Sequence, residues 1–106
     1  MVTAIIKKNS NKYVSFECKG HAGFAEAGSD IVCSAISMLS INTANSIIEL
    51  TDTSINPKEK NGFLFWEFTD YIDDKATLLM DSLVLGLKTI EDTYSNKYLT
   101  LNIEEV

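Results

Sequence analysis

Two stretches near the N-terminus alternate between apolar and polar residues, which is the pattern of half-buried strands. These stretches are residues 2–8 and 13–19, joined by a short turn rich in Asn and Ser. The alternation places Tyr13 on the polar face of the second stretch and Cys18 on its apolar face. We therefore predict a β-hairpin in which Cys18 is a small buried apolar residue.

The longest pattern in the chain is helical. Apolar residues recur at helical spacing over residues 31–50, and no charge occurs in this stretch before Glu49. Ser29 or Asp30 can offer a side-chain oxygen to the free N–H groups of a first helical turn. We expect the helix to begin just after them, to follow an aperiodic loop over residues 20–28, and to be mostly covered.

The second half of the chain repeats the order of a strand pair and a helix. Pro57 cannot donate to a strand ladder, which suits an edge, and Asn61-Gly62 is a strong signal for a two-residue hairpin turn. The predicted elements are an edge strand at 52–60, a strand at 63–68, a helix from Asp73 or Asp74 to about Asn96, and a closing strand at 98–104.

The predicted order of elements, ββαββαβ, is typical of an α+β protein. We expect two layers, with a largely antiparallel sheet and two helices on one of its faces. No linker or shift in composition divides the sequence. We therefore predict one domain over residues 1–106.

The predicted strand at 63–68 is apolar on both faces. When its inward positions fill the core, Phe63 and Phe65 point the other way, and exposed patches of this kind are unusual on monomers. A segment near Tyr71 could cover them, or an aromatic side chain of a substrate could bind there. A third possibility is a symmetric second copy of the chain, whose identical patch would meet this one across a twofold axis.

Composition and charge narrow the classes of function. The formal net charge is −6, and all nine basic residues are lysines, which disfavours nucleic-acid binding and is compatible with a basic protein partner or with solubility alone. No apolar run is expected to be long enough to span a membrane. Two cysteines without a secretory segment predict a reducing, cytoplasmic location.

The loop before the first helix brings together the residue types of an activated thiol. It holds the only histidine, His21, and leads to Cys33, while Gly20, Gly23 and Gly28 provide hinges. An imidazole within reach and the positive end of a helix both lower the pKa of a thiol, whose ordinary value is about 8.5. If Asp30 caps the helix, Cys33 lies in its first turn, where free N–H groups could form an oxyanion hole.

Each of these residues also has an ordinary structural explanation, such as a polar loop histidine or a core cysteine. Their combination predicts a thiol site, in which Asp30 caps the helix, orients His21, or does both. A metal site would need Cys18, His21, Cys33 and a fourth ligand, so we predict no metal. No phosphate-binding or dinucleotide-binding loop occurs, so we expect no cofactor.

The motif residues also resemble those of a known family. They are Gly20-His21-Ala22, then Gly28-x-Asp30-Ile31-Val32-Cys33, then Ser37. This pattern resembles the signature of the ribosomal-processing cysteine protease family of Firmicutes and their relatives, and the resemblance in length and element order covers essentially the whole chain. The family removes a short N-terminal extension from a large-subunit ribosomal protein by cutting after an aromatic residue.

The resemblance implies His21 as general base, Cys33 as nucleophile and a homodimer. Ser37 lies four residues after Cys33 and so shares its helix face, where it could support the site or simply bond to a backbone carbonyl. Ser34 stands where the family usually has alanine, and we expect it to be tolerated. The leading hypothesis is a cysteine endopeptidase, and the alternative is a non-catalytic module that binds a basic ribosomal or ribosome-assembly protein.

Overall fold

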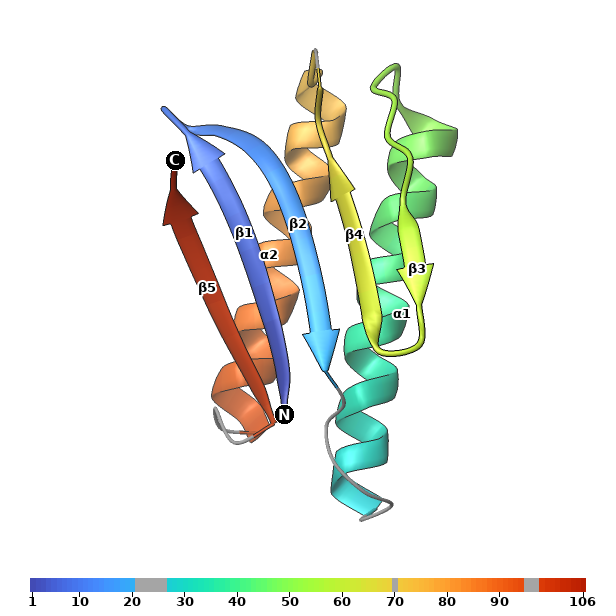
Figure 1. Ribbon diagram of the computed structural model, residues 1–106, viewed down its shortest axis with the longest axis vertical. Coiled ribbons are helices and arrows are strands. Elements are labelled where there is room, and N and C mark those ends of the chain that lie inside the picture. The colour runs from blue at the N-terminus through green and yellow to red at the C-terminus, as the bar shows by residue number, and fades with distance from the viewer. Residues whose placement is uncertain (21–26, 70, 95–97) are drawn as a thin grey trace.

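The computed structural model describes residues 1–20, 27–69, 71–94 and 98–106. The elements are β1 (Val2–Asn9), β2 (Lys12–Gly20), α1 (Ala27–Leu50), β3 (Lys58–Lys60), β4 (Phe63–Glu67), α2 (Asp74–Tyr94) and β5 (Leu99–Glu105). Figure 1 shows the strands as one layer with both helices on the same face. The predicted order ββαββαβ and the two-layer α+β fold are therefore confirmed.

The first strand of the chain lies inside the sheet. The strand order is β3-β4-β2-β1-β5. Neighbouring strands are antiparallel except for β1 and β5, which run parallel with Val2 opposite Leu99. A parallel neighbour cannot be reached by a tight hairpin, and the chain reaches β5 through α2. The sheet is therefore largely antiparallel, as expected, with one parallel pair at the β5 edge.

The core lies between the sheet and the helices. Phe16 on β2 and Trp66 on β4 are cross-strand neighbours, and their ring centroids are 4.7 Å apart. The buried apolar residues of the helices are Val32, Ile36, Ala44 and Ile47 on α1 and Ala76, Met80, Leu83 and Leu87 on α2. Where the helices meet, a Cβ added at Gly86 would lie 2.6 Å from Leu39 Cδ2. Gly86 therefore lets Leu39 pack against the backbone of α2.

Helix α1 is more apolar and more open than predicted. An 18-residue window within Ile31–Leu50 has a mean hydropathy of 1.5, so this helix is long and apolar enough to cross a membrane, contrary to expectation, and a core helix of a soluble protein meets the same criterion. Only 33% of this segment is buried, so the prediction that the helix is mostly covered is wrong. A helix in a two-layer fold rests on the sheet with one side and leaves the other side open, and here Ile31 and Met38 are exposed.

A β-bulge in the first hairpin changes the face of the sheet on which Tyr13 lies. The register between β1 and β2 shifts between Lys7 and Lys8, so that Lys8 pairs with Tyr13 and Val14 has no opposite residue on β1. The extra residue turns Tyr13 onto the helix side, where it is buried and its hydroxyl donates a hydrogen bond to Asp81 of α2. The prediction that Tyr13 lies on the polar face of the strand is therefore wrong.

The edge strand β3 covers only Lys58–Lys60 instead of the predicted residues 52–60. The preceding segment is tied to the start of α2. The carboxylate of Asp73 accepts hydrogen bonds from the backbone N–H groups of Ala76, at 2.7 Å, and Asp52, at 2.9 Å. Asp73 therefore caps α2, which confirms the predicted start of this helix.

Candidate active site

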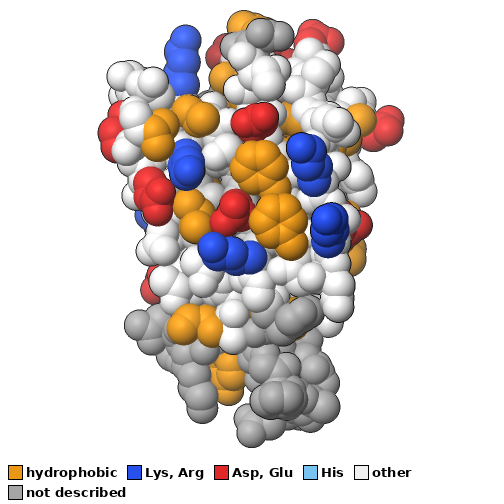
Figure 2. Space-filling model, viewed as in Figure 1, with side chains coloured by type: hydrophobic (Ala, Val, Ile, Leu, Met, Phe, Trp, Pro, Cys, Tyr) orange, Lys and Arg blue, Asp and Glu red, His pale blue; other side chains and the backbone are white. Residues whose placement is uncertain are grey.

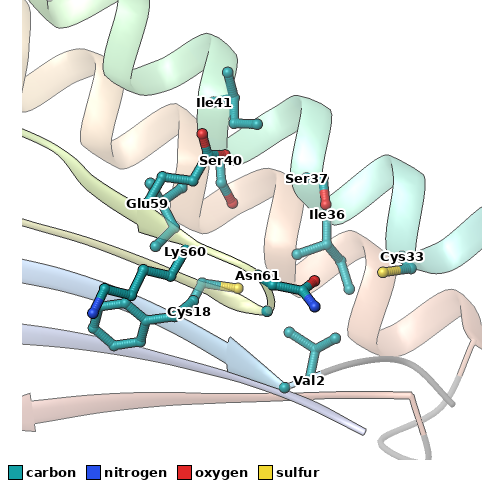
Figure 3. Close-up of a pocket in the computed structure, with 14 residues that line it drawn as sticks. Val2, Cys18, Cys33, Ile36, Ser37, Ser40, Ile41, Glu59, Lys60 and Asn61 are labelled. Atoms are coloured by element: carbon teal, nitrogen blue, oxygen red, sulfur yellow. The ribbon is translucent and has the colours of Figure 1, made fainter.

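Cys33 lines a cavity between α1 and the β3–β4 hairpin (Figure 3). The cavity has a volume of about 280 Å³. Cys33, Ser37 and Ser40 follow one another on the same face of α1 and form one wall, and the hairpin turn at Asn61 and Gly62 forms the facing wall. The other lining residues are Val2, Cys18, Gly20, Ile36, Ile41, Glu59, Lys60, Phe63 and Leu64.

Helix α1 begins earlier than predicted, at Ala27. Gly28, expected as a loop hinge, and Asp30, expected as a possible cap, both lie inside its first turn, so these two expectations are wrong. Alanine is the best helix former, and a single glycine costs only about 1 kcal/mol relative to alanine. The helix therefore continues through Gly28 and includes two residues, 27 and 28, that were expected in the loop.

Cys33 is consequently the seventh residue of α1 and lies in its second turn. Only the first four N–H groups of a helix are free, so the N–H of Cys33 is used by the helix itself. The effect of the helix dipole also falls off within the first turn. The prediction that Cys33 is surrounded by free first-turn N–H groups, which could form an oxyanion hole, is therefore wrong.

The two cysteines of the chain line the same cavity, from different elements. Cys18 is on β2 and Cys33 is on α1, and both thiols are free and half-buried. Burial, and to a smaller extent the nearby Cys33 and Glu17, raises the pKa of the Cys18 thiol to about 11. At neutral pH Cys18 is therefore protonated, and it packs against the core as predicted.

Gly20 ends β2 at the edge of the cavity. Its φ of +102° is in the region that favours glycine, and an added Cβ would lie 2.4 Å from the carbonyl oxygen of Met1. Its N–H donates a hydrogen bond to the carbonyl oxygen of Gly62 at 2.8 Å. Glycine is therefore required at the end of β2, and its hydrogen bond ties this end of the strand to the hairpin turn.

The remaining predicted site residues are placed as follows. His21 and Gly23 lie outside the described residues. The backbone of Asp30 is helical, three residues before Cys33. Ser37 lines the cavity together with Cys33, as its spacing predicted. Ser34 is exposed on α1, so the serine at this position has no packing to disturb.

Two polar residues of the cavity were not identified as site residues from the sequence. Asn61 was assigned only to the hairpin turn, but its side chain extends from that turn toward the Cys33 side of the cavity (Figure 3). Ser40 was treated as part of an apolar helix. Its spacing of seven residues from Cys33 was the available signal, because residues at this interval share a helix face.

The fold and the cavity together define a small α+β protein with a cysteine at a cavity wall, which is an arrangement suited to thiol chemistry. The family model of the cysteine protease Prp matches residues 1–99 of this chain. The chain therefore belongs to the Prp family of cysteine proteases. This membership makes it a cysteine-type peptidase and decides against the non-catalytic alternative.

Individual relatives agree with this assignment. The ribosomal processing cysteine protease Prp of Bacillus subtilis (strain 168) is 34% identical over 111 residues, which cover 97% of this chain and 99% of the relative. The Prp of Staphylococcus aureus (strain Mu50) is 33% identical over 105 residues, covering 96% and 98%. Both relatives are therefore similar to this chain over essentially their full length.

Solved structures match the fold equally well. A crystal structure of the S. aureus ribosomal processing protease Prp with a covalently linked product peptide has a TM-score of 0.88 and 31% identity, covering 98% of this chain and 100% of that chain. A second structure, of the same protease with a substrate peptide, also has a TM-score of 0.88, at 29% identity. These two relatives bind peptides.

Proposed function

We propose that this protein is a cysteine endopeptidase that removes the N-terminal extension of a large-subunit ribosomal protein. Its curated relatives are ribosomal processing proteases, and the S. aureus structures contain peptides. The observation that carries the proposal for the residues is that Cys33 lines a cavity whose other cysteine, Cys18, is held protonated by burial. A pKa of about 11 holds Cys18 protonated, which leaves Cys33 as the nucleophile.

The proposed reaction uses Cys33 and His21. His21 takes the proton of the Cys33 thiol, and the sulfur attacks the carbonyl carbon of the scissile peptide bond. The C–N bond breaks, His21 returns the proton to the leaving amine, and an acyl-thioester remains on Cys33. Water then attacks this thioester, which releases the carboxylate product and restores the thiol.

Two further residues are assigned supporting roles. Because position 30 lies inside α1 and does not precede its first turn, Asp30 is not the helix cap. We therefore assign Asp30 to the orientation of His21. Ser37 shares the cavity with Cys33, and we assign its hydroxyl to the support of the site. Replacement of Ser37 by alanine should lower kcat/KM, whereas an unchanged kcat/KM would return this hydroxyl to a purely structural role.

The substrate, cellular location and cofactor requirement of the enzyme follow from the same proposal. Its substrate is a ribosomal protein precursor, and its location is the cytoplasm, where ribosomes are assembled. A net charge of −6 favours encounter with such basic proteins and disfavours direct binding of nucleic acid. The proposed reaction needs no metal or cofactor, since a thiol and an imidazole supply the nucleophile and the base.

A homodimer is proposed through the open face of the sheet. Phe63 and Phe65 lie on this face, with ring centroids 6.5 Å apart, and Figure 2 shows an apolar patch there surrounded by lysines and acidic residues. Lys19 and Lys60 flank Phe63 across the strands, and Glu17 pairs with Phe65. A twofold axis would let the apolar patch meet itself and bring opposite charges together at its rim.

Mass spectrometry of the substrate tests the proposed function directly. The ribosomal protein precursor is incubated with the wild-type protein or with the Cys33→Ala variant, and the intact masses are measured. We expect the wild type to remove the N-terminal extension and the variant to leave the precursor uncut while remaining folded. Normal turnover by Cys33→Ala would reject the mechanism.

A further inference from the structure

One hydroxyl in the wall of the cavity has no protein partner. Ser40 is only 1% exposed, and its Oγ has no hydrogen-bond partner among the described residues. Two threonine hydroxyls, one on α1 and one just after its end, are instead paired with the carbonyl four residues earlier. Thr43 Oγ1 donates to the carbonyl oxygen of Leu39 at 2.8 Å, and Thr51 Oγ1 donates to that of Ile47 at 2.7 Å.

An unpaired buried hydroxyl requires an explanation. Buried polar side-chain atoms in native proteins nearly always have a hydrogen-bond partner, because leaving one unpaired costs the free energy of its desolvation. Ser40 lines the cavity that contains Cys33, so a group that enters this cavity can provide the missing partner. The hydroxyl is thus placed to bind a ligand instead of stabilising the helix.

The distance between Ser40 and Cys33 indicates which part of a ligand this would be. The two residues are seven positions apart on one face of α1, with Ser37 between them (Figure 3). At a rise of 1.5 Å per residue, they are separated by about 10 Å along the helix axis. An extended peptide advances about 3.3 Å per residue, so the separation corresponds to roughly three residues of substrate.

We propose that Ser40 is a specificity-determining residue, whose hydroxyl hydrogen-bonds a polar group of the substrate peptide about three residues from the scissile bond. The facing wall supports binding of a polar segment, since Glu59, Lys60 and Asn61 line it. This inference rests on the proposed function, because it takes Cys33 as the residue at the scissile bond. It concerns binding, however, and can be tested without turnover.

The test measures binding of a peptide that spans the cleavage junction, using calorimetry. The Cys33→Ala protein binds the peptide without cutting it and is compared with the Cys33→Ala/Ser40→Ala protein. We expect the dissociation constant to rise about tenfold, which corresponds to ~1.4 kcal/mol. The melting temperature should not fall, because the removed hydroxyl has no partner in the free protein. The matched control is Thr43→Val, which removes a paired hydroxyl and should lower the melting temperature without changing affinity.

Substrate variants then locate the partner group. Peptides with alanine at each position near the scissile bond are bound to both proteins. If Ser40→Ala no longer weakens binding of the peptide with alanine about three residues from the scissile bond, the partner of Ser40 is the side chain that this alanine replaced. If the effect persists for every peptide, the partner is a backbone group. Both results support the proposal. If Ser40→Ala loses its effect only for the peptide with alanine next to the scissile bond, the proposed position of the Ser40 contact would be overturned.

Two results would overturn the role of Ser40 altogether. These are equal dissociation constants for the two proteins and failure of the peptide to bind the Cys33→Ala protein. Equal constants would leave the proposed function untouched if the wild type still cuts the precursor. Conversely, failure of the wild type to cut would reject the proposed function even if binding depends on Ser40. The two proposals therefore fail in distinguishable ways.

Discussion

Cys18 on β2 and Cys33 on α1 line the same cavity, although they are fifteen positions apart in the sequence. They lie on different elements, and burial raises the pKa of the Cys18 thiol to about 11. A thiol reacts as its thiolate, and at neutral pH almost none of Cys18 is in this form. In the proposed reaction Cys33 is the nucleophile, and Cys18 then provides a matched unreactive reference in the same molecule.

The raised pKa of Cys18 predicts that alkylation will be selective for Cys33. Iodoacetamide at neutral pH should modify Cys33 and leave Cys18 unmodified in the folded protein, as measured by peptide mass mapping. Cys18→Ala should leave the labelling of Cys33 unchanged, and Cys33→Ala should remove the fast labelling. After unfolding in urea both cysteines should react. Preferential labelling of Cys18 in the folded protein would contradict the assignment of the nucleophile.

The open sheet face predicts an effect of charge on oligomeric state. Phe65 stacks on Phe63 on this face. Phe65→Asp replaces one of the two rings by a carboxylate and should yield monomers at micromolar concentration in sedimentation velocity. The control is Leu78→Asp on α2, which adds the same charge at an apolar position that is 68% exposed on the helix layer. Circular dichroism checks that both variants are folded. A dimeric Phe65→Asp with a monomeric Leu78→Asp would move the interface to the helices.

The buried Tyr13 predicts a change in stability at high pH. Burial and the hydrogen bond to Asp81 raise the pKa of Tyr13 above its ordinary value of 10.0. In the unfolded chain the phenol loses its proton near pH 10, whereas in the folded protein it keeps the proton. The stability linked to Tyr13 is therefore complete below pH 10 and is lost as the pH rises above it.

Tyr13→Phe should remove this part of the pH dependence. We expect the variant to be less stable than the wild type by about 1 kcal/mol at neutral pH, because it loses one hydrogen bond. The difference should shrink above pH 10 in urea unfolding experiments. Tyr71→Phe is the control, since Tyr71 is 69% exposed and should change neither value. A constant difference from pH 7 to pH 11 would contradict the role of the Tyr13 hydroxyl.

The order of elements could be predicted from the sequence because it depends on local patterns. Alternation identified β1, β2 and β5, helical spacing identified both helices, and Asn61-Gly62 identified the turn before β4. The same patterns placed Cys33 and Ser37 on one helix face, which the cavity confirms. Side-chain periodicity is a property of neighbouring residues, so it does not require knowledge of the fold.

Other features depend on contacts between distant segments, and only the tertiary structure decided them. The bulge at Val14 turns Tyr13 toward Asp81, which is 68 positions away. The cavity joins α1 to a hairpin turn, so the meeting of Cys18 and Cys33 at one cavity and the unpaired hydroxyl of Ser40 appear only when the sheet and helix are assembled. Burial sets both the pKa of a thiol and the cost of an unpaired hydroxyl, and burial is determined by packing against residues remote in sequence.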